Sequence, residues 1–445
     1  MTPSVTQSAA GAASPLRHKD GGWSASSIYA LAMLTLTNAF NYFDRLLISI
    51  LFPLIQEDMG LTDTELGLIT GVVFVLVYAI MGIPIARLAD RRSRKVIIGI
   101  GFTFWSAMTL LTAFVTNVWQ MAATRFLMGA GEAAATPPST SMLSDIFDPA
   151  RRPLAFAIML SGTAISGLVL TPIGGWIGQN YGWRPAYLIA GAVGMVLGLL
   201  MIFTVREPKR GRFDEATVPQ DAEEPALVPS VLYLFARRTF VLTMIAAALN
   251  TISFHAHLVW STTFMLRVHD MNVADSAALL GSIRGIAGLA GALVAGALLA
   301  KLQKRDERWS VWLPSICLTT VGLSQFIFLF APTIPLVGLG VAINTLAEGM
   351  MVPLMSLILV PIMPARIRTL GMATYFFVIA IIGQIVGPVG VGMLNDALSS
   401  IWHQEAIRYS MSITAIVGAF AGPTLFLAGK HLRRDLDFAK HWSGQ

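Results

Sequence analysis

The sequence predicts an all-α membrane protein in which twelve transmembrane helices form two pseudo-symmetric six-helix bundles. Composition, hydrophobic runs and an internal repeat support this fold class. Of the 445 residues, 55% are hydrophobic and only 13% are charged, and the mean hydropathy is +0.67. A soluble protein of this size does not bury that much apolar surface in its core. Lipid must therefore solvate a large part of the chain.

Twelve mostly apolar runs are long enough to cross the hydrocarbon core of a bilayer, which needs about 20 residues of helix. They lie at 28–54, 66–86, 96–116, 119–144, 154–177, 185–205, 239–265, 277–300, 310–330, 333–360, 369–394 and 407–428. Lipid offers no hydrogen-bond partner to the backbone, and the runs are too long for barrel strands. Each run is therefore predicted to be a helix.

The runs divide the chain into five parts. These are a disordered cytoplasmic N-terminus at 1–27, a first bundle at 28–205, a cytoplasmic linker at 206–238, a second bundle at 239–429 and a cytoplasmic tail at 430–445. The N-terminus is rich in Ala, Ser and Gly. The first run is too long for the apolar region of a cleaved signal peptide, and it contains Asp44 and Arg45. The linker combines four prolines with an acidic patch: Pro208, Pro219, Pro225, Pro229, Asp221, Glu223 and Glu224.

Positive charge predicts the orientation. Among the loops on the side opposite the termini, only Arg184, Arg267 and Arg408 supply Lys or Arg, although the chain has 31 such residues. Under the positive-inside rule both termini are cytoplasmic. We expect a multi-pass, monomeric protein of the plasma membrane, which in bacteria is the inner membrane. Topology explains the pI near 9.6 without a nucleic-acid partner, and the single cysteine, Cys317, excludes an intrachain disulfide.

The two halves share a repeat. At an offset of 216 residues, Gly167, Pro172 and Gly174 match Gly383, Pro388 and Gly390, and the same offset relates three more pairs: Glu132 with Glu348, Pro137 with Pro353, and Arg152 with Arg368. An offset of 212 matches Asn38 with Asn250 and Asp63 with Asp275. Matches at nearly constant spacing indicate a duplicated six-helix unit.

Three local motifs carry a resemblance to a known family. They are Gly82-x-x-x-Ala86-x-x-x-Asp90-Arg91-Arg92-Ser93-Arg94-Lys95, Arg125-x-x-x-Gly129-x-Gly131 and Thr171-Pro172-Ile173-Gly174-Gly175. They resemble the cytoplasmic loop, fourth-helix and fifth-helix motifs of the major facilitator superfamily, with Ala86 and Ser93 in place of the usual glycines. The resemblance implies the major facilitator fold, two six-helix halves around a central cavity.

Within that superfamily, Asn41-Tyr42-Phe43-Asp44-Arg45 and Gly129-Ala130-Gly131-Glu132-Ala133 resemble the spinster branch. Its animal members move sphingosine-1-phosphate and lysophospholipids, so the resemblance implies lipid transport. Similar short segments occur in organic-anion transporters of the superfamily, and the substrate therefore stays open at this point.

Ionisable residues inside the spans are the candidate functional residues, because burying a charge in lipid is costly. Arg125 and Glu132 lie two helical turns apart and face the same way. At 1.5 Å per residue, Asp44 falls between them in depth, so we expect it to pair with Arg125. We assign proton coupling to Asp44 and Glu132, and substrate binding to Tyr42, Arg45, Arg125, Glu132 and Glu348. The alternative is an ion cluster that only locks helices together.

Other polar residues have weaker assignments. Arg284 could extend the polar lining of the cavity alongside Glu348. His255 and His257 stand where Asp44 and Arg45 would be duplicated, and ordinary helix–helix hydrogen bonding is favoured for them over titration. Two histidines at i and i+2 point to different helix faces, so no metal site is predicted.

A gate is predicted on the cytoplasmic side. By resemblance, Asp90 would pair with a basic residue near Arg151 or at the start of span eleven and latch that side shut. The predicted gating residues are Asp90, Arg91, Arg151 and Arg152. Charges that only set topology are the alternative for the basic residues.

These observations predict a secondary active transporter, coupled to protons, that moves an amphipathic anionic substrate such as a lysophospholipid or sphingoid phosphate by alternating access. No G-x-x-x-x-G-K-[ST] motif occurs, which argues against an ATP-driven pump. No pattern predicts an enzyme or a cofactor. A proton-coupled organic-anion or multidrug transporter is the first alternative, and a sensor with a transporter fold is the second.

Overall fold

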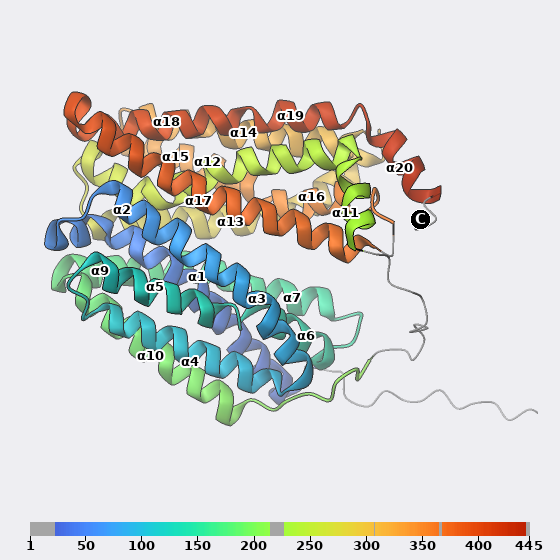
Figure 1. The fold of residues 1–445 in the computed structure, drawn as a ribbon, viewed down its shortest axis with the longest axis horizontal. Coiled ribbons are helices and arrows are strands. Elements are labelled where there is room, and N and C mark those ends of the chain that lie inside the picture. Colours follow the sequence, from blue (N-terminus) through green and yellow to red (C-terminus); the bar gives the residue numbers. More distant parts are fainter. Residues whose placement is uncertain (1–22, 214–226, 307, 365–366, 442–445) are drawn as a thin grey trace, which may run out of the picture.

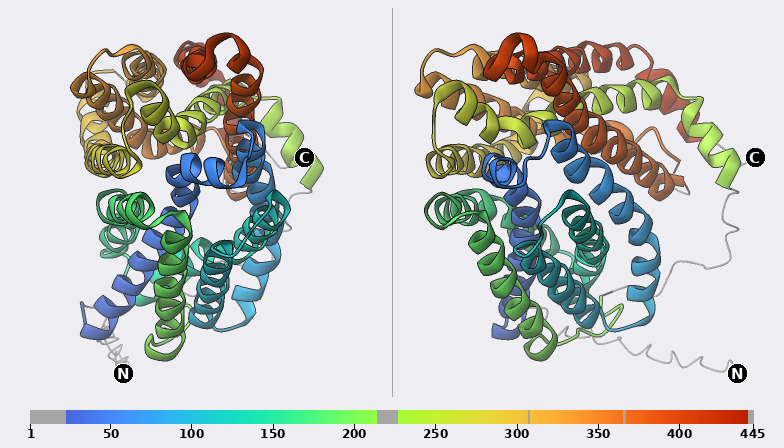
Figure 2. Two further views of the ribbon diagram at one scale, coloured as in Figure 1. Left: turned by 90° about the vertical axis from the view of Figure 1, so that its left-hand side faces the viewer. Right: turned by 60° about the vertical axis from the view of Figure 1, so that its left-hand side comes forward.

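The computed structural model describes residues 23–213, 227–306, 308–364 and 367–441, and every regular element in these ranges is helical. Twelve spans form two bundles that lie side by side (Figures 1 and 2). The predicted fold class is confirmed. Residues 1–22 of the predicted N-terminus lie outside the described residues, as do Pro219, Pro225 and the acidic patch of the linker.

The N-terminal bundle contains six spans, three of which are single helices and three of which are built from several helical segments. In chain order they are α1 (Ala25–Met59); α2 (Asp63–Leu68), η1 (Ile69–Val73) and α3 (Phe74–Arg91); α4 (Arg94–Thr112); α5 (Val118–Glu132) and α6 (Thr136–Ile146); α7 (Arg152–Leu160), α8 (Gly162–Ile165), η2 (Ser166–Leu170) and α9 (Thr171–Tyr181); and α10 (Trp183–Thr204).

The C-terminal bundle repeats this order. Its spans are α12 (Arg238–His269); α13 (Val273–Gln303); α14 (Trp309–Phe330); α15 (Ile334–Gly349) and α16 (Met351–Leu359); α17 (Arg368–Trp402); and α18 (Ala406–Ala419) and α19 (Ala421–Ala428). Two short helices lie outside the spans, α11 (Leu227–Phe235) and α20 (Leu432–His441). A 3-10 turn, η4 (His403–Glu405), precedes α18.

Helix ends differ from the apolar runs because caps, not hydropathy, set them. The hydroxyl of Ser24 accepts a hydrogen bond from the Ser27 amide, so α1 begins at Ala25, inside the segment predicted to be disordered. The helix continues to Met59, where Gly60 ends it with a left-handed φ of 65°. In the segment 206–238 predicted as a linker, α11 forms a further helix.

Nine helical stretches in the described residues are long and apolar enough to cross a membrane, and one of them, Leu370–Ala428, contains two spans. The spans outside this set are α1 and α5–α6. These two spans hold the buried residues Asp44, Arg125 and Glu132. Their charged side chains face neighbouring helices, as charged groups in membrane proteins usually do.

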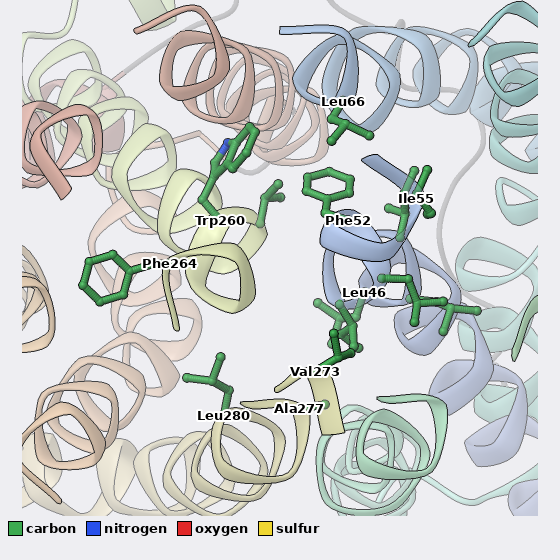
Figure 3. Packing of buried hydrophobic residues seen from close by; sticks show 14 of the residues in the cluster. Leu46, Phe52, Ile55, Leu66, Trp260, Phe264, Val273, Ala277 and Leu280 are labelled. Carbon is green, nitrogen blue, oxygen red and sulfur yellow. The ribbon is translucent and has the colours of Figure 1, made fainter. Parts of the chain in front are cut away.

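The hydrophobic core shows where the bundles meet. One cluster combines both bundles at the ends of the spans away from the termini, and there Phe52 of α1 and Trp260 of α12 lie with ring centroids 5.5 Å apart (Figure 3). At the other end the clusters separate, one within each bundle. The bundles therefore share a core only at the end opposite the termini, which we call the outer end.

Glycines allow close approach at this contact. A Cβ on Gly281 of α13 would lie 2.4 Å from the carbonyl oxygen of Gly167 in η2, and a Cβ on Gly67 of α2 would lie 2.8 Å from the carbonyl oxygen of Pro388 in α17. No side chain fits at either position without moving backbone. The two bundles thus meet through main-chain surfaces on both sides of the interface.

Candidate functional site

A buried polar cluster occupies the middle of the N-terminal bundle, where α1 crosses α5. Asp44 is 1% exposed, Arg125 is 2% exposed and Glu132 is fully buried. Further members come from α3, α4 and α10. The sequence prediction that these residues lie together is correct, but their pairing differs from the expected one.

Glu132 forms the ion pair of the cluster. Its Oε2 accepts a hydrogen bond from Arg45 Nε at 2.7 Å and another from Asn41 Nδ2 at 3.0 Å. The guanidinium of Arg45 also lies over the rings of Phe74 and Tyr78, at 4.9 and 4.6 Å from their centroids. Arg45 keeps 27% of its side chain exposed, so it is the accessible partner of a fully buried acid.

Asp44 is bound differently. Its Oδ2 accepts a hydrogen bond from the indole Nε1 of Trp105 at 2.9 Å, whereas Oδ1 has no partner among the described residues. Arg125 donates to the main-chain oxygen of Asp44 at 3.2 Å and to the hydroxyl of Tyr187 at 3.2 Å. The expected pairing of Arg125 with the Asp44 carboxylate is therefore wrong. Arg45, one residue further along α1, forms the ion pair because it reaches Glu132.

The C-terminal bundle contains a simpler counterpart. Asn250 of α12 donates to Glu348 of α15 at 3.0 and 3.3 Å, as Asn41 donates to Glu132 in the first bundle. By contact, Asn250 thus corresponds to Asn41, one helical turn from Asn38, the residue matched by sequence offset. Among the described residues no basic side chain forms an ion pair with Glu348.

Arg284 of α13 is the basic residue of this bundle that faces the centre. It donates to Ser261 Oγ at 2.7 Å and to the main-chain oxygen of His257 at 3.5 Å, and in the described residues it has no carboxylate partner. Tyr42 of α1 lies within electrostatic range of Arg284, Arg45 and Glu348.

The hydrogen bonds to another helix that were expected for the two histidines of α12 are not found among the described residues, and both ring nitrogens of His257 are buried without a partner there. His255 Nδ1 lies 2.9 Å from the main-chain oxygen of Thr251, one turn earlier in α12. The ring of His257 packs edge-on against Phe328, with centroids 4.5 Å apart. The described residues contain no group of three His, Cys, Asp or Glu side chains that could hold a metal.

Among the described residues, no ion pair joins the predicted gating residues to the C-terminal bundle. Asp90 and Arg91 are exposed, and in the described ranges Asp90 forms no ion pair. Arg151 pairs with Asp148 at 3.3 Å, and Arg152 donates to main-chain oxygens of Ser144 and Phe147 at 3.0 and 3.2 Å. These contacts stay within the N-terminal bundle. The gating roles remain predictions.

Arg94, which the sequence analysis did not select, is the buried residue of that loop. It is 2% exposed and pairs with Asp145 at 2.5 Å and with Glu207 at 2.9 Å. Burial would raise the pKa of Glu207, but hydrogen bonds from the Lys95 amide, Ser93 and Arg94 outweigh it and lower the pKa. This network ties α4, α6 and the segment after α10 together.

A second missed feature closes the outer end. Arg267 of α12 pairs with Asp63 of α2 through contacts of 2.6 and 2.8 Å and also donates to Gln56 at 2.8 Å. Asp396 of α17 accepts the amides of Asp63 and Thr64 at 3.1 and 2.8 Å. We call these residues the outer clamp. Within the described residues, the hydrogen bonds between bundles all lie at this end.

Comparison with known proteins gives the same picture. The model of the Major Facilitator Superfamily matches residues 34–310. An MFS-type efflux pump of Mycolicibacterium smegmatis is 29% identical over 413 residues, with 92% of this chain and 94% of that protein covered. The sphingosine-1-phosphate transporter SPNS2 of Danio rerio is 24% identical, with 90% and 83% covered.

One solved structure extends the comparison to three dimensions. It is a bacterial homolog of the human lysosomal transporter Spinster in an inward-facing and unoccupied conformation. The two chains are 25% identical and align with a TM-score of 0.80, covering 93% of this chain and 99% of the other. The separated cores and the outer clamp of this chain match an arrangement that is closed at the outer end.

Proposed function

Since the chain belongs to the major facilitator superfamily and is a multi-pass membrane transporter of spinster-like type rather than an enzyme, we propose that it couples proton movement to the transport of an amphipathic anionic substrate. The observation that carries this proposal is the contact of Asn41 and Arg45 with Glu132 in the N-terminal bundle, together with Arg284 of the C-terminal bundle, which has no carboxylate partner among the described residues. We propose that the transporter is a monomer in the plasma membrane, with both termini in the cytoplasm.

Glu132 and Asp44 are the proposed proton carriers. Each has one carboxylate oxygen with no partner among the described residues, Oε1 in Glu132 and Oδ1 in Asp44. An added proton needs such a free oxygen. When Glu132 is ionised it holds Arg45, and when it is protonated the charge that holds Arg45 is lost. Proton uptake at Glu132 therefore changes how freely the Arg45 guanidinium can meet a substrate.

Arg45 and Arg284 are the proposed anion-binding groups, one from each bundle. A guanidinium binds phosphate or carboxylate oxygens through two parallel hydrogen bonds. Tyr42 is within electrostatic range of both, and we assign its hydroxyl to the same binding site. Glu348 lies in the same region and would repel a dianionic head group, so we assign it to substrates that also carry an ammonium, such as a sphingoid phosphate. Arg125 is bound to Tyr187 and main chain, and we now assign it a positioning role.

The alternating-access step follows from the contacts between bundles. The outer clamp and the glycine contacts hold the outer end closed, while the cores at the other end are separate. Rocking of one bundle on the other would break the clamp and expose the site on the outer side. With the proposed orientation, the present state opens to the cytoplasm.

A proton-coupled organic-anion or multidrug transporter is the second candidate. The similarity to the Mycolicibacterium smegmatis efflux pump favours it. Such a protein would use the acids, rather than Arg284, to select substrates. A ligand sensor with this fold is less well supported, because a protein that only binds its ligand does not need a buried acid that releases its arginine partner when it is protonated.

Transport by purified protein in liposomes tests the proposal. With an imposed proton gradient, sphingosine-1-phosphate should accumulate more than lysophosphatidic acid, which lacks an ammonium, and a cationic drug should not accumulate. A protonophore should stop the accumulation. Uptake of cationic drugs without any response to the anionic lipids would favour the second candidate, and binding without turnover would indicate a sensor.

A further inference from the structure

A basic cavity lies outside the transport site, at the end of the C-terminal bundle near the chain's C-terminus. Its volume is about 130 Å³, and Ala236, Arg237, Arg238, His431, Arg434, Asp435 and Phe438 line it. Three elements meet here: the end of α11, the start of α12 and helix α20. Neither the family resemblance nor the transport mechanism uses this cavity.

The cavity has an excess of positive charge. Its three arginines face one aspartate, which leaves a net charge of +2 with His431 neutral. None of these arginines forms an ion pair with a carboxylate of the described residues. Asp435 is 4% exposed and accepts the Thr239 amide at 2.8 Å, so its carboxylate is engaged with α12.

Two aromatic rings hold one arginine of the cavity in place before any ligand binds. The guanidinium of Arg237 lies between the rings of Tyr233 and Phe438, 4.5 and 4.3 Å from their centroids. Its Nε is buried and has no hydrogen-bond partner among the described residues. The guanidinium of Arg434 lies 5.5 Å from the centroid of the same Phe438 ring. Stacking reduces the side-chain entropy that an anion would otherwise have to remove on binding.

The surroundings of the cavity place it at a lipid surface. Helix α11 runs across the direction of the spanning helices at the end of the C-terminal bundle (Figure 1). Leu232 and Phe235 of α11 are 64% and 44% exposed, and Phe438 of α20 is 42% exposed. Short helices with an exposed apolar side and adjacent arginines lie in the membrane interface, where lipid head groups are found.

We propose that this cavity binds the phosphate head group of an anionic phospholipid from the leaflet that α11 contacts. Arg237, Arg238 and Arg434 would contact the phosphate, and the exposed side chains of α11 would contact the acyl chains. The bound lipid would join α11 and α20 to the first turn of α12. Juxtamembrane arginines are attracted to anionic leaflets in this way.

Native mass spectrometry of the full-length protein, titrated with phosphatidylglycerol and with phosphatidylcholine of equal chain length, tests the proposal. Phosphatidylglycerol should bind more tightly. The variant Arg238→Gln/Arg434→Gln changes two exposed side chains and should weaken this binding by about 25-fold, about fivefold for each arginine. Arg237→Lys keeps the charge but not the stacking and should weaken it less.

The matched control is Lys304→Gln/Arg305→Gln, which removes two exposed positive charges from the end of α13 and should leave lipid binding unchanged. Equal binding of the two lipids, or equal losses in the control and test variants, would overturn the proposal. Inorganic phosphate that competes as well as the lipid would assign the cavity to a free anion instead. Neutralising Asp221, Glu223 and Glu224 tests whether the chain's own acidic segment is the occupant: tighter lipid binding after that change would mean that it competes.

Discussion

The two bundles share a repeat and one polar contact, but they differ in the charges around it. Both place an asparagine from their first span against a glutamate from their fourth, Asn41 with Glu132 and Asn250 with Glu348. In the part of the chain that the structure describes, an arginine pairs with Glu132 but none pairs with Glu348, and the N-terminal bundle also buries Asp44 one residue from that arginine. The comparison indicates that the hydrogen bond belongs to the repeated framework, whereas the ion pair is specific to one bundle.

That difference suggests a division of roles. A framework hydrogen bond tolerates a neutral partner, because an amide oxygen also accepts a hydrogen bond. An ion pair does not tolerate it. We therefore assign coupling to the N-terminal bundle and anion recognition largely to Arg284 of the C-terminal bundle. The experiments below are arranged by how strongly they separate the two bundles.

The largest effect should come from Glu132→Gln and Asp44→Asn. Each amide resembles the protonated acid, so gradient-driven uptake should be lost while the protein remains folded and inserted. Glu348→Gln is the matched control in the other bundle. It keeps an acceptor for Asn250 and should reduce uptake by about tenfold or less, the worth of one ordinary hydrogen bond. Uptake in liposomes measures all three variants. Equal losses of uptake in the variants of the two bundles would contradict the proposed division of roles.

The next largest effect should follow from removing the contact that joins the bundles. Arg267→Gln breaks the ion pair with Asp63, in which the arginine is 24% and the acid 5% exposed. Loss of one partner of such a pair costs about 1–3 kcal/mol, enough to shift the balance of two states by about fivefold to a hundredfold.

Spin labels on the two bundles at the outer end would report this shift as longer distances. Arg184→Gln is the control, because Arg184 pairs with Asp58 inside the N-terminal bundle, where both groups are about 40% exposed. Unchanged distances in Arg267→Gln would show that the glycine contacts alone hold the outer end closed.

A smaller effect should separate the arginines of the two bundles. Arg284→Gln removes a guanidinium that has no carboxylate partner in the described residues, and we expect about tenfold weaker binding of an anionic lysolipid. Arg125→Lys keeps its charge and changes a residue bound to Tyr187 and main chain. Calorimetric titration should show little change in affinity for this variant. A larger loss of affinity in Arg125→Lys than in Arg284→Gln would instead assign anion recognition to Arg125 of span four.

The smallest effect concerns the cytoplasmic loop. Because hydrogen bonds lower the pKa of Glu207, the ionised residue stabilises the fold above the ordinary pKa of a glutamate, and this contribution is lost as the pH falls through the lowered value. Thermal unfolding should therefore show a decline in wild-type stability in that acidic range that is reduced in Glu207→Gln. Asp90→Asn should change neither stability nor bundle distances in this state.

Much of the architecture could be predicted because hydropathy and the internal repeat can be recognised from the order of residues alone, without knowledge of the fold. The superfamily, the twelve spans and the meeting of Asp44, Arg125 and Glu132 were predicted correctly. Pairing was not, because one residue along a helix turns a side chain by about 100°, which decides whether Arg45 or Asp44 reaches span four. Arg94 and Arg267 were missed for a related reason: their partners Glu207 and Asp63 lie more than a hundred residues away, and only the fold brings them together.

The glycine contacts between the bundles bear on the speed of transport as well as on closure. Where Gly167 meets Gly281, main-chain atoms of the two bundles lie against each other and the side chain of Thr171 packs beside them. Few side chains have to move before the bundles separate at this point, so the contacts that oppose rocking are the outer clamp and the apolar core shared at the outer end. In Gly281→Ala the added Cβ would lie 2.4 Å from a carbonyl oxygen, so it should keep the two bundles slightly apart at this contact. We expect this variant to return more slowly to the state with a closed outer end. Time-resolved distance measurements would show this as slower relaxation.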